Sequence, residues 1–216
     1  MTRAARLGCV VGPHRPLRLR WLALLGLLAT APAAATPQTG EILPEVTVDG
    51  SDGSHRQLPD RRIATVVIYE DSDAGKQNLR AAALIDATTD LVENKAKLEA
   101  VAVADLEKWN FWPARKFALA EVKKVAAKER STIYVDLKAG LRRAWKLSKH
   151  KSGILVLGTD GRVRFAAEGP LSDGQIDDLK KALQSLGVSL PAQIQAEGLY
   201  HEVPKTPPLP PATNPQ

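Results

Sequence analysis

Two aspartates separated by one residue directly follow an apolar segment of the sequence. Asp71 and Asp73 come after residues 63–69 (IATVVIY), whose continuous β-branched character is typical of a strand buried on both faces. In a metal-dependent, phosphatase-like hydrolase, such a pair supplies a nucleophile and an acid–base group around Mg²⁺. The second acidic pair that this chemistry needs would have to be Asp177–Asp178, which falls inside a predicted amphipathic helix. We therefore favour solvated acids that cap a helix beginning near Gly75, and keep the hydrolase as the alternative.

The three histidines that follow residue 35 do not have the spacing of metal ligands. His55, His150 and His201 fall in a predicted turn, a basic loop and a Pro-rich tail, where surface positions are the simplest interpretation. The sequence contains neither a G-x-S-x-G motif nor a P-loop. We therefore predict no catalytic residue, no metal ligand and no cofactor.

Three aromatic residues lie close together before a predicted helix. Trp109, Phe111 and Trp112 precede Pro113, which fits the first turn of that helix. The favoured interpretation is that they pack beneath the start of the helix as part of the core. The alternative is an exposed contact surface, because Trp and Phe are common anchors of protein interfaces.

Charge is unevenly distributed along the chain. The formal net charge is +6, and residues 138–151 contain six cations and no acid, whereas residues 36–112 are acidic overall. Mutual neutralisation of neighbouring faces is the simpler explanation, and a basic site for an anionic small molecule or an acidic protein surface is the alternative. Because no nucleic-acid recognition module is present, we expect no nucleic-acid partner.

The first 35 residues have the three parts of a secretory signal. Five arginines without an acid precede the apolar run 21–30, and small residues then lead to Ala35. Ten apolar residues make a helix of about 15 Å, too short for a stable membrane span. We expect cleavage near Ala35 and a periplasmic or secreted protein, with an uncleaved N-terminal anchor as the alternative. Cys9 is the only cysteine, so residues 36–216 contain no thiol.

The remaining pattern predicts an α/β domain. A hairpin over 41–60 is followed by strands at 63–69, 98–104, 132–135, 154–157 and 162–166. Helices are predicted at 75–94, from Pro113 onward, at 139–147 and at 172–186. This alternation predicts a thioredoxin-like fold, a mixed central sheet with helices on both faces. Residues 36–187 would form the domain, and 188–216 a Pro-rich tail.

Two segments carry a family resemblance. Residues 41–70 (EILPEVTVDGSDGSHRQLPDRRIATVVIYE) resemble the opening of redoxin domains, a branch of the thioredoxin superfamily. The segment from Ile133 (IYVDLKAGLRRAWKLSKHKSGILVLGTDGRVRFAAEGPLS) is similar to the YtfJ family of small exported bacterial proteins. The likeness covers roughly residues 40–187, with most of its specificity in 136–145 and 160–169. It implies the fold and carries over no ligand or activity.

The redoxin motif itself is missing. Aligning the strands places Gly75 and Asn78, neither of which is a cysteine, where redoxins have their CxxC pair. The position of the redoxin cis-proline falls at Ser152 or Gly153, where we expect trans peptide bonds because a cis bond would cost about 2.5–4 kcal/mol.

These observations predict an exported, redox-inactive binding or interaction module of the bacterial cell envelope. Besides the hydrolase, a chaperone-like holdase remains an alternative. The expected binding face lies on the side of the missing redox site, together with the aromatic contact residues. It comprises Asp71, Asp73, Gly75, Lys76, Asn78, Lys149, His150, Lys151 and Ser152.

Overall fold

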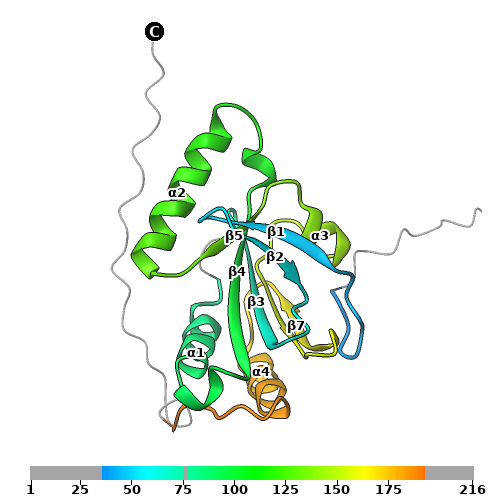
Figure 1. The fold of residues 1–216 in the computed structure, drawn as a ribbon. Helices are drawn as coiled ribbons and strands as arrows, with labels where there is room; N and C mark the ends of the chain where they lie inside the picture. The colour runs from blue at the N-terminus through cyan, green and yellow to red at the C-terminus, as the bar shows by residue number, and fades with distance from the viewer. Residues whose placement is uncertain (1–35, 75–76, 193–216) are drawn as a thin grey trace, which may run out of the picture. The chain divides into compact units, whose positions relative to one another are not determined.

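A seven-stranded mixed sheet forms the centre of the computed structural model, which describes residues 36–74 and 77–192 (Figure 1). The strand order is β2-β1-β5-β4-β3-β6-β7. Strands β3, β4 and β5 run parallel, whereas the hairpins β1–β2 and β6–β7 add antiparallel strands at the two sides. The bounds are β1 Val46–Gly50, β2 His55–Leu58, β3 Ala64–Asp71, β4 Leu98–Asp105, β5 Ile133–Asp136, β6 Gly153–Leu157 and β7 Val163–Glu168.

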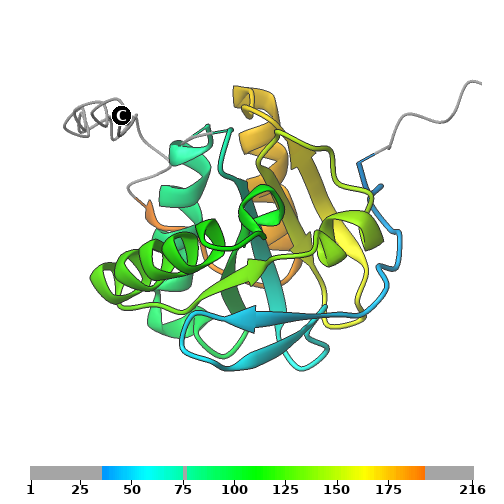
Figure 2. The same ribbon diagram turned by 90° about the horizontal axis from the view of Figure 1, so that it is seen from above.

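Helices cover both faces of this sheet, as predicted. They are α1 Leu79–Thr89, α2 Ala114–Glu129, α3 Gly140–Ala144 and α4 Asp173–Ser185, with short 3₁₀ turns η1 Val92–Asn94 and η2 Glu107–Trp109. Helices α1 and α4 pack on one face, and α3 packs on the other (Figure 2). The thioredoxin-like arrangement inferred from the sequence is therefore confirmed.

Successive side chains of β3 pack into two separate cores, because neighbouring residues of a strand point to opposite faces of the sheet. Val66 packs with α1 and α4, whereas Val67 and Tyr69 pack in the core that contains Leu141 and Trp145 from the α3 region. All three strand residues are fully buried. The apolar run at 63–69 is thus a strand with two buried faces, as its composition predicted.

Helix α4 agrees with the helix predicted over 172–186. Ser172 and Gln175 form a reciprocal capping box, which satisfies backbone N–H groups at the helix start. Ile176, Leu179 and Leu183 are buried.

Helix α1 is shorter than the predicted helix over 75–94. It begins at Leu79, so Asp71 and Asp73 do not cap it, and the capping role predicted for these acids is wrong. At its other end the buried Asn94 side chain donates to the carbonyl oxygens of Thr88 (2.8 Å) and Ser189 (2.7 Å). These bonds compete with continuation of the helix. They also hold Ser189 against the domain, so the fold extends beyond the predicted boundary at residue 187.

Helix α2 is much more exposed than its pattern predicted. Ala118, Val122 and Val125, which recur at i, i+4 and i+7 on one helix face, are only partly buried, and Ala126 is the buried residue of this helix. The helix packs mainly beside β5 and η2 and leaves most of its surface to solvent.

Asp60 fixes the turn between β2 and β3. Its carboxylate accepts bonds from the backbone N–H (2.9 Å) and the guanidinium (2.9 Å) of Arg62, which lower its pKa to about 2. A carboxyl whose folded pKa is lowered stabilises the protein above its unfolded pKa, and this contribution is lost as pH falls through the folded value. Asp60→Asn should therefore lower the free energy of unfolding by about 1–2 kcal/mol at pH 7, and by progressively less as the pH falls from about 4 to about 2. Urea unfolding at several pH values measures this, and a cost independent of pH would contradict it.

The predicted signal (1–35), Gly75, Lys76 and the tail from residue 193 lie outside the described residues. In the described ranges, no helix has the length and apolar character needed to cross a membrane.

Candidate functional site

Three parallel strands end on aspartate at the same edge of the sheet. Asp71, Asp105 and Asp136 are the last residues of β3, β4 and β5, and they are register partners across the three strands. The carboxyl ends of parallel strands are a common position for binding sites in α/β proteins. Of these three residues only Asp71 was predicted as a site residue, because the strands predicted at 98–104 and 132–135 each stop one residue before the Asp that ends β4 or β5.

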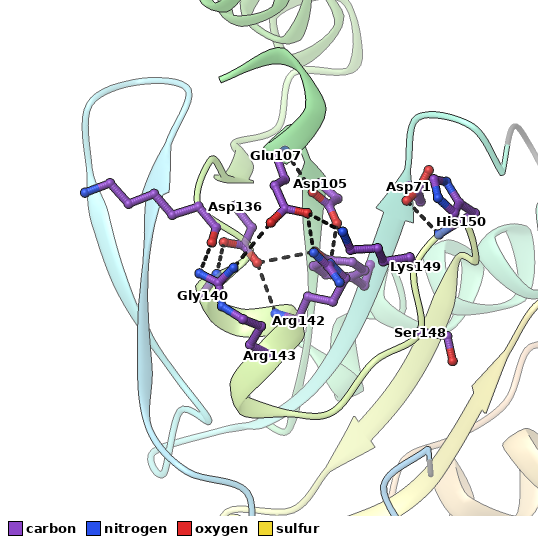
Figure 3. A network of polar contacts seen from close by, with 12 residues as sticks. Asp71, Asp105, Glu107, Asp136, Gly140, Arg142, Arg143, Ser148, Lys149 and His150 are labelled. Carbon is purple, nitrogen blue, oxygen red and sulfur yellow. Dashed lines mark hydrogen bonds and ion pairs between the residues drawn. The ribbon is translucent and has the colours of Figure 1, made fainter. Parts of the chain in front are cut away.

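Arg142 of α3 neutralises the central part of this edge (Figure 3). Its guanidinium donates to Asp105 at 3.0 Å and also bonds Glu107. The side chains of Arg142 and Asp105 are each only 6% exposed, so the ion pair is buried. Glu107 further pairs with Arg143 at 3.3 Å and Lys149 at 3.5 Å. The network joins α3 and the loop before β6 to the segment that follows β4.

Asp136 organises the start of α3 and meets a buried tyrosine. It accepts backbone N–H bonds from Gly140 (2.6 Å) and Arg142 (3.0 Å), and the Tyr69 hydroxyl donates to it at 3.3 Å. Burial, followed by the negative charges of Asp136 and Asp105, raises the pKa of Tyr69 far above its ordinary value. Tyr69 is therefore a neutral hydrogen-bond donor that secures the network.

A second polar cluster forms around Asp71, Asp73 and His150. The backbone N–H of His150 donates to Asp71 at 3.0 Å, and its Nδ1 lies 3.2 Å from Asp73 (Figure 3 shows the Asp71 contact). Lys108 forms an ion pair with Asp73. The Lys108 ammonium is the main cause of a lowered pKa at Asp73. The structure thus brings together residues that were predicted for the same face from separate segments.

Asn78 and Ser152 line an open hollow between α1 and β6. Glu70, Leu79 and Gly153 also contribute to its wall. The Asn78 side chain bonds the backbone of Gly169 and Leu171, at 3.0 Å each. The described cis peptide bonds are Leu58–Pro59 and Trp112–Pro113, so the bonds before Ser152 and Gly153 are trans, as predicted.

The aromatic segment is exposed, and the interpretation that it belongs to the core is wrong. Trp109, Phe111 and Trp112 are 40%, 58% and 88% exposed, and Phe117 in the first turns of α2 is 70% exposed. Lys108 lies over the Trp109 ring, 5.1 Å from its centroid. The ion pairs of Glu107 fix the start of this segment, while Phe111 and Trp112 remain more than half exposed.

Most of the basic segment 138–151 is neutralised by acids of the earlier half of the chain. Arg142, Arg143 and Lys149 share Glu107, and Lys146 pairs with Glu41 at 3.7 Å. In the described part of the chain, Lys138 and Lys151 form no ion pair. The geometry favours mutual neutralisation over a dedicated anion site there.

The sequence matches the model of the family described as "Bacterial protein of unknown function (YtfJ_HI0045)" over residues 67–186, more than half of the chain. The chain belongs to this family. The match spans β3 through α4 and therefore includes Asp71, Asp105, Asp136 and Arg142. Membership in the YtfJ_HI0045 family confirms the resemblance seen in the sequence. No curated protein matches the chain.

Solved structures confirm the fold. A putative thiol:disulfide interchange protein DsbE from Chlorobium tepidum has a TM-score of 0.51 at 15% identity, covering 69% of this chain and 98% of that one. A cysteine-to-serine mutant of PrxQ from Xylella fastidiosa has a TM-score of 0.50 at 12% identity, with coverage of 71% and 99%. An uncharacterised conserved protein from Geobacillus kaustophilus has a TM-score of 0.51 at 18% identity, with coverage of 72% and 86%. At these identities the likeness shows a shared thioredoxin-like fold.

Proposed function

We propose that this YtfJ_HI0045 family member is an exported, redox-inactive binding module of the bacterial cell envelope. In this proposal, it contacts another protein through the aromatic segment Trp109–Trp112 together with Phe117. The observation that carries the proposal is the exposure of these side chains, up to 88% for Trp112. Clustered exposed aromatic residues are costly in water and typically mark interaction surfaces.

The ion pairs behind the segment support this role. Buried Arg142 binds Asp105 at the end of β4 and Glu107 in η2, immediately before the aromatic residues. A contact surface that is already ordered loses less conformational entropy on binding than a loop that must be ordered first. The segment is therefore suited to docking.

The charge beside the aromatic residues indicates the kind of partner. Helix α2 adds exposed Arg115, Lys116 and Lys123, for which the described residues provide no ion pair. An apolar protein surface flanked by acidic side chains fits this combination, because opposite charges at the rim speed association and orient the partner.

Two features of the sequence support a role without redox chemistry outside the cytoplasm. Residues 1–35 have the pattern of a secretory signal, and the chain's only cysteine lies within them. Without a cysteine, the exported part has no thiolate for disulfide exchange or peroxide reduction.

Site-specific photo-crosslinking in intact cells tests the proposed surface. A photoreactive amino acid at Trp112 or Phe117 should capture an envelope protein. The matched control is Val92 in η1, which is also highly exposed, at 81%. Because η1 precedes β4 and the aromatic segment follows β4, the control lies at the other end of this strand. Equal capture at Val92, or no adduct at either aromatic position, would overturn the proposal.

A further inference from the structure

Asp71, Asp73 and His150 place three possible metal-ligating atoms around one point. One carboxylate oxygen from each aspartate and one imidazole nitrogen all lie within 4.8 Å of one another. Asp71 ends β3, Asp73 lies in the following turn, and His150 lies in the loop before β6. Because β3 and β6 are paired neighbours in the sheet, two segments far apart in the sequence meet here.

Backbone contacts hold these ligands in position. One oxygen of Asp71 accepts the N–H of Asp73 at 2.7 Å, and the other accepts the N–H of His150 at 3.0 Å. Asp71 therefore fixes the other two residues relative to itself. Each carboxylate oxygen has a second lone pair, so these bonds leave it able to bind an ion.

The carboxylates already attract a cation from a third segment. The ammonium group of Lys108 pairs with Asp73, while the same side chain lies over the ring of Trp109. Lys108 thus offsets one of the two negative charges of the cluster when no metal ion is present. Its position also connects the cluster to the aromatic segment.

We propose that Asp71, Asp73 and His150 form a binding site for a divalent transition-metal ion that takes the place of the Lys108 ammonium. Two carboxylates and one imidazole suit ions such as Zn²⁺ and Mn²⁺, whereas sites for Ca²⁺ are built from oxygen ligands alone. The His150 side chain is 70% exposed and that of Asp73 is 42% exposed, so an ion can enter from solvent and keep water as its remaining ligands.

Metal binding would also change the surface proposed for protein contact. When the ion displaces Lys108, the ammonium leaves Asp73 and its cation–π contact with Trp109 is free to break. The exposed area of Trp109 then increases. Only this consequence rests on the proposed function, because the metal site itself needs no protein partner.

The test measures binding of Mn²⁺ and Zn²⁺ to the purified full chain by titration calorimetry, with Mn²⁺ electron paramagnetic resonance as a second readout. Asp73→Asn and His150→Ala should each weaken binding at least about tenfold, because each removes a ligand. Lys108→Met should strengthen it by about tenfold, because it removes a positive charge that competes for Asp73 and repels the ion while leaving all three ligands.

His55→Ala is the matched control. His55 also pairs with an aspartate, Asp49 at 2.8 Å, but it has no second carboxylate beside it in the described residues. This variant should bind metal as the unchanged protein does. The opposite shifts of Lys108→Met and Asp73→Asn separate metal ligation from a general effect on folding, which would not strengthen binding.

Binding in the unchanged protein, weakened by both ligand substitutions and strengthened by Lys108→Met, supports the site. Any other pattern overturns it, including no binding at about 1 mM metal. Because these measurements use the isolated protein, failure of the metal site is distinguishable from failure of the photo-crosslinking experiment.

Discussion

Replacing Arg142 by methionine is expected to lower the free energy of unfolding by about 3–5 kcal/mol. The substitution keeps much of the apolar side-chain length but leaves Asp105 buried without its cationic partner, and an uncompensated buried charge is strongly destabilising. Against a typical total of about 5–15 kcal/mol, this loss is large. Urea unfolding at pH 7 measures it, and a loss below about 1 kcal/mol would show that water or another cation compensates Asp105.

The double variant Arg142→Met, Asp105→Asn separates the charge from the packing. Because asparagine is neutral and can still accept the bond that Asp105 receives from the N–H of Glu107 (2.9 Å), the double variant should recover part of the lost stability. If the double variant is no more stable than Arg142→Met, the stability lost in the single variant came from poorer packing or from the unpaired charge of Glu107, and not from that of Asp105.

The same substitution should loosen the aromatic segment. Arg142 pairs with both Asp105 and Glu107, the two residues that flank Leu106 just before the aromatic segment. Hydrogen exchange of residues 106–112 should therefore accelerate more in Arg142→Met than exchange in α4, which lies on the other face of the sheet. If exchange increased equally in both, Arg142 would be a general stabiliser with no particular hold on this segment.

The fold could be predicted because its determinants are local in the sequence. The apolar segment 63–69 is long enough for one buried strand, the Asp160–Gly161 turn joins β6 to β7, and Ser172 with Gln175 marks the start of α4. Each signal lies within a few residues, and the alternation of elements then limits the topology to few arrangements.

The site was harder to predict because its partners are distant in the sequence. Arg142 is 37 residues from Asp105 and 35 from Glu107, so its charge looked like part of a basic segment with no acids nearby. The common C-terminal Asp of β3, β4 and β5 was a usable signal, because parallel strands of similar register bring their ends together.

The aromatic segment was misjudged for a different reason. Residue type favours burial of Trp and Phe, but burial also requires another element to pack on them. Helix α2 leaves most of its surface in solvent, and Trp112 beside it stays exposed. A single sequence contains no local signal for this outcome.

Trp145 differs sharply from Trp112 in its burial. The substitution Trp145→Ala is expected to lower the free energy of unfolding by about 3–5 kcal/mol. The Trp145 side chain is fully buried in the core that also contains Leu43 and Leu141, and its indole Nε1 donates to the carbonyl of Pro44 at 2.9 Å. Alanine would leave a cavity in this core and a carbonyl without its donor. Thermal or urea unfolding measures the loss.

Two matched variants make the interpretation specific. Trp145→Phe keeps an aromatic ring in the core but loses the bond to Pro44, so it should cost about 1–2 kcal/mol. Trp112→Ala removes a side chain that is 88% exposed and should change stability by about 0.5 kcal/mol or less. A large loss of stability in Trp112→Ala would place that residue in a structural contact and remove the main support for a binding surface. If its stability is unchanged, any loss of crosslinking from Phe117 in the same variant reflects the surface itself, because the fold that presents it is intact.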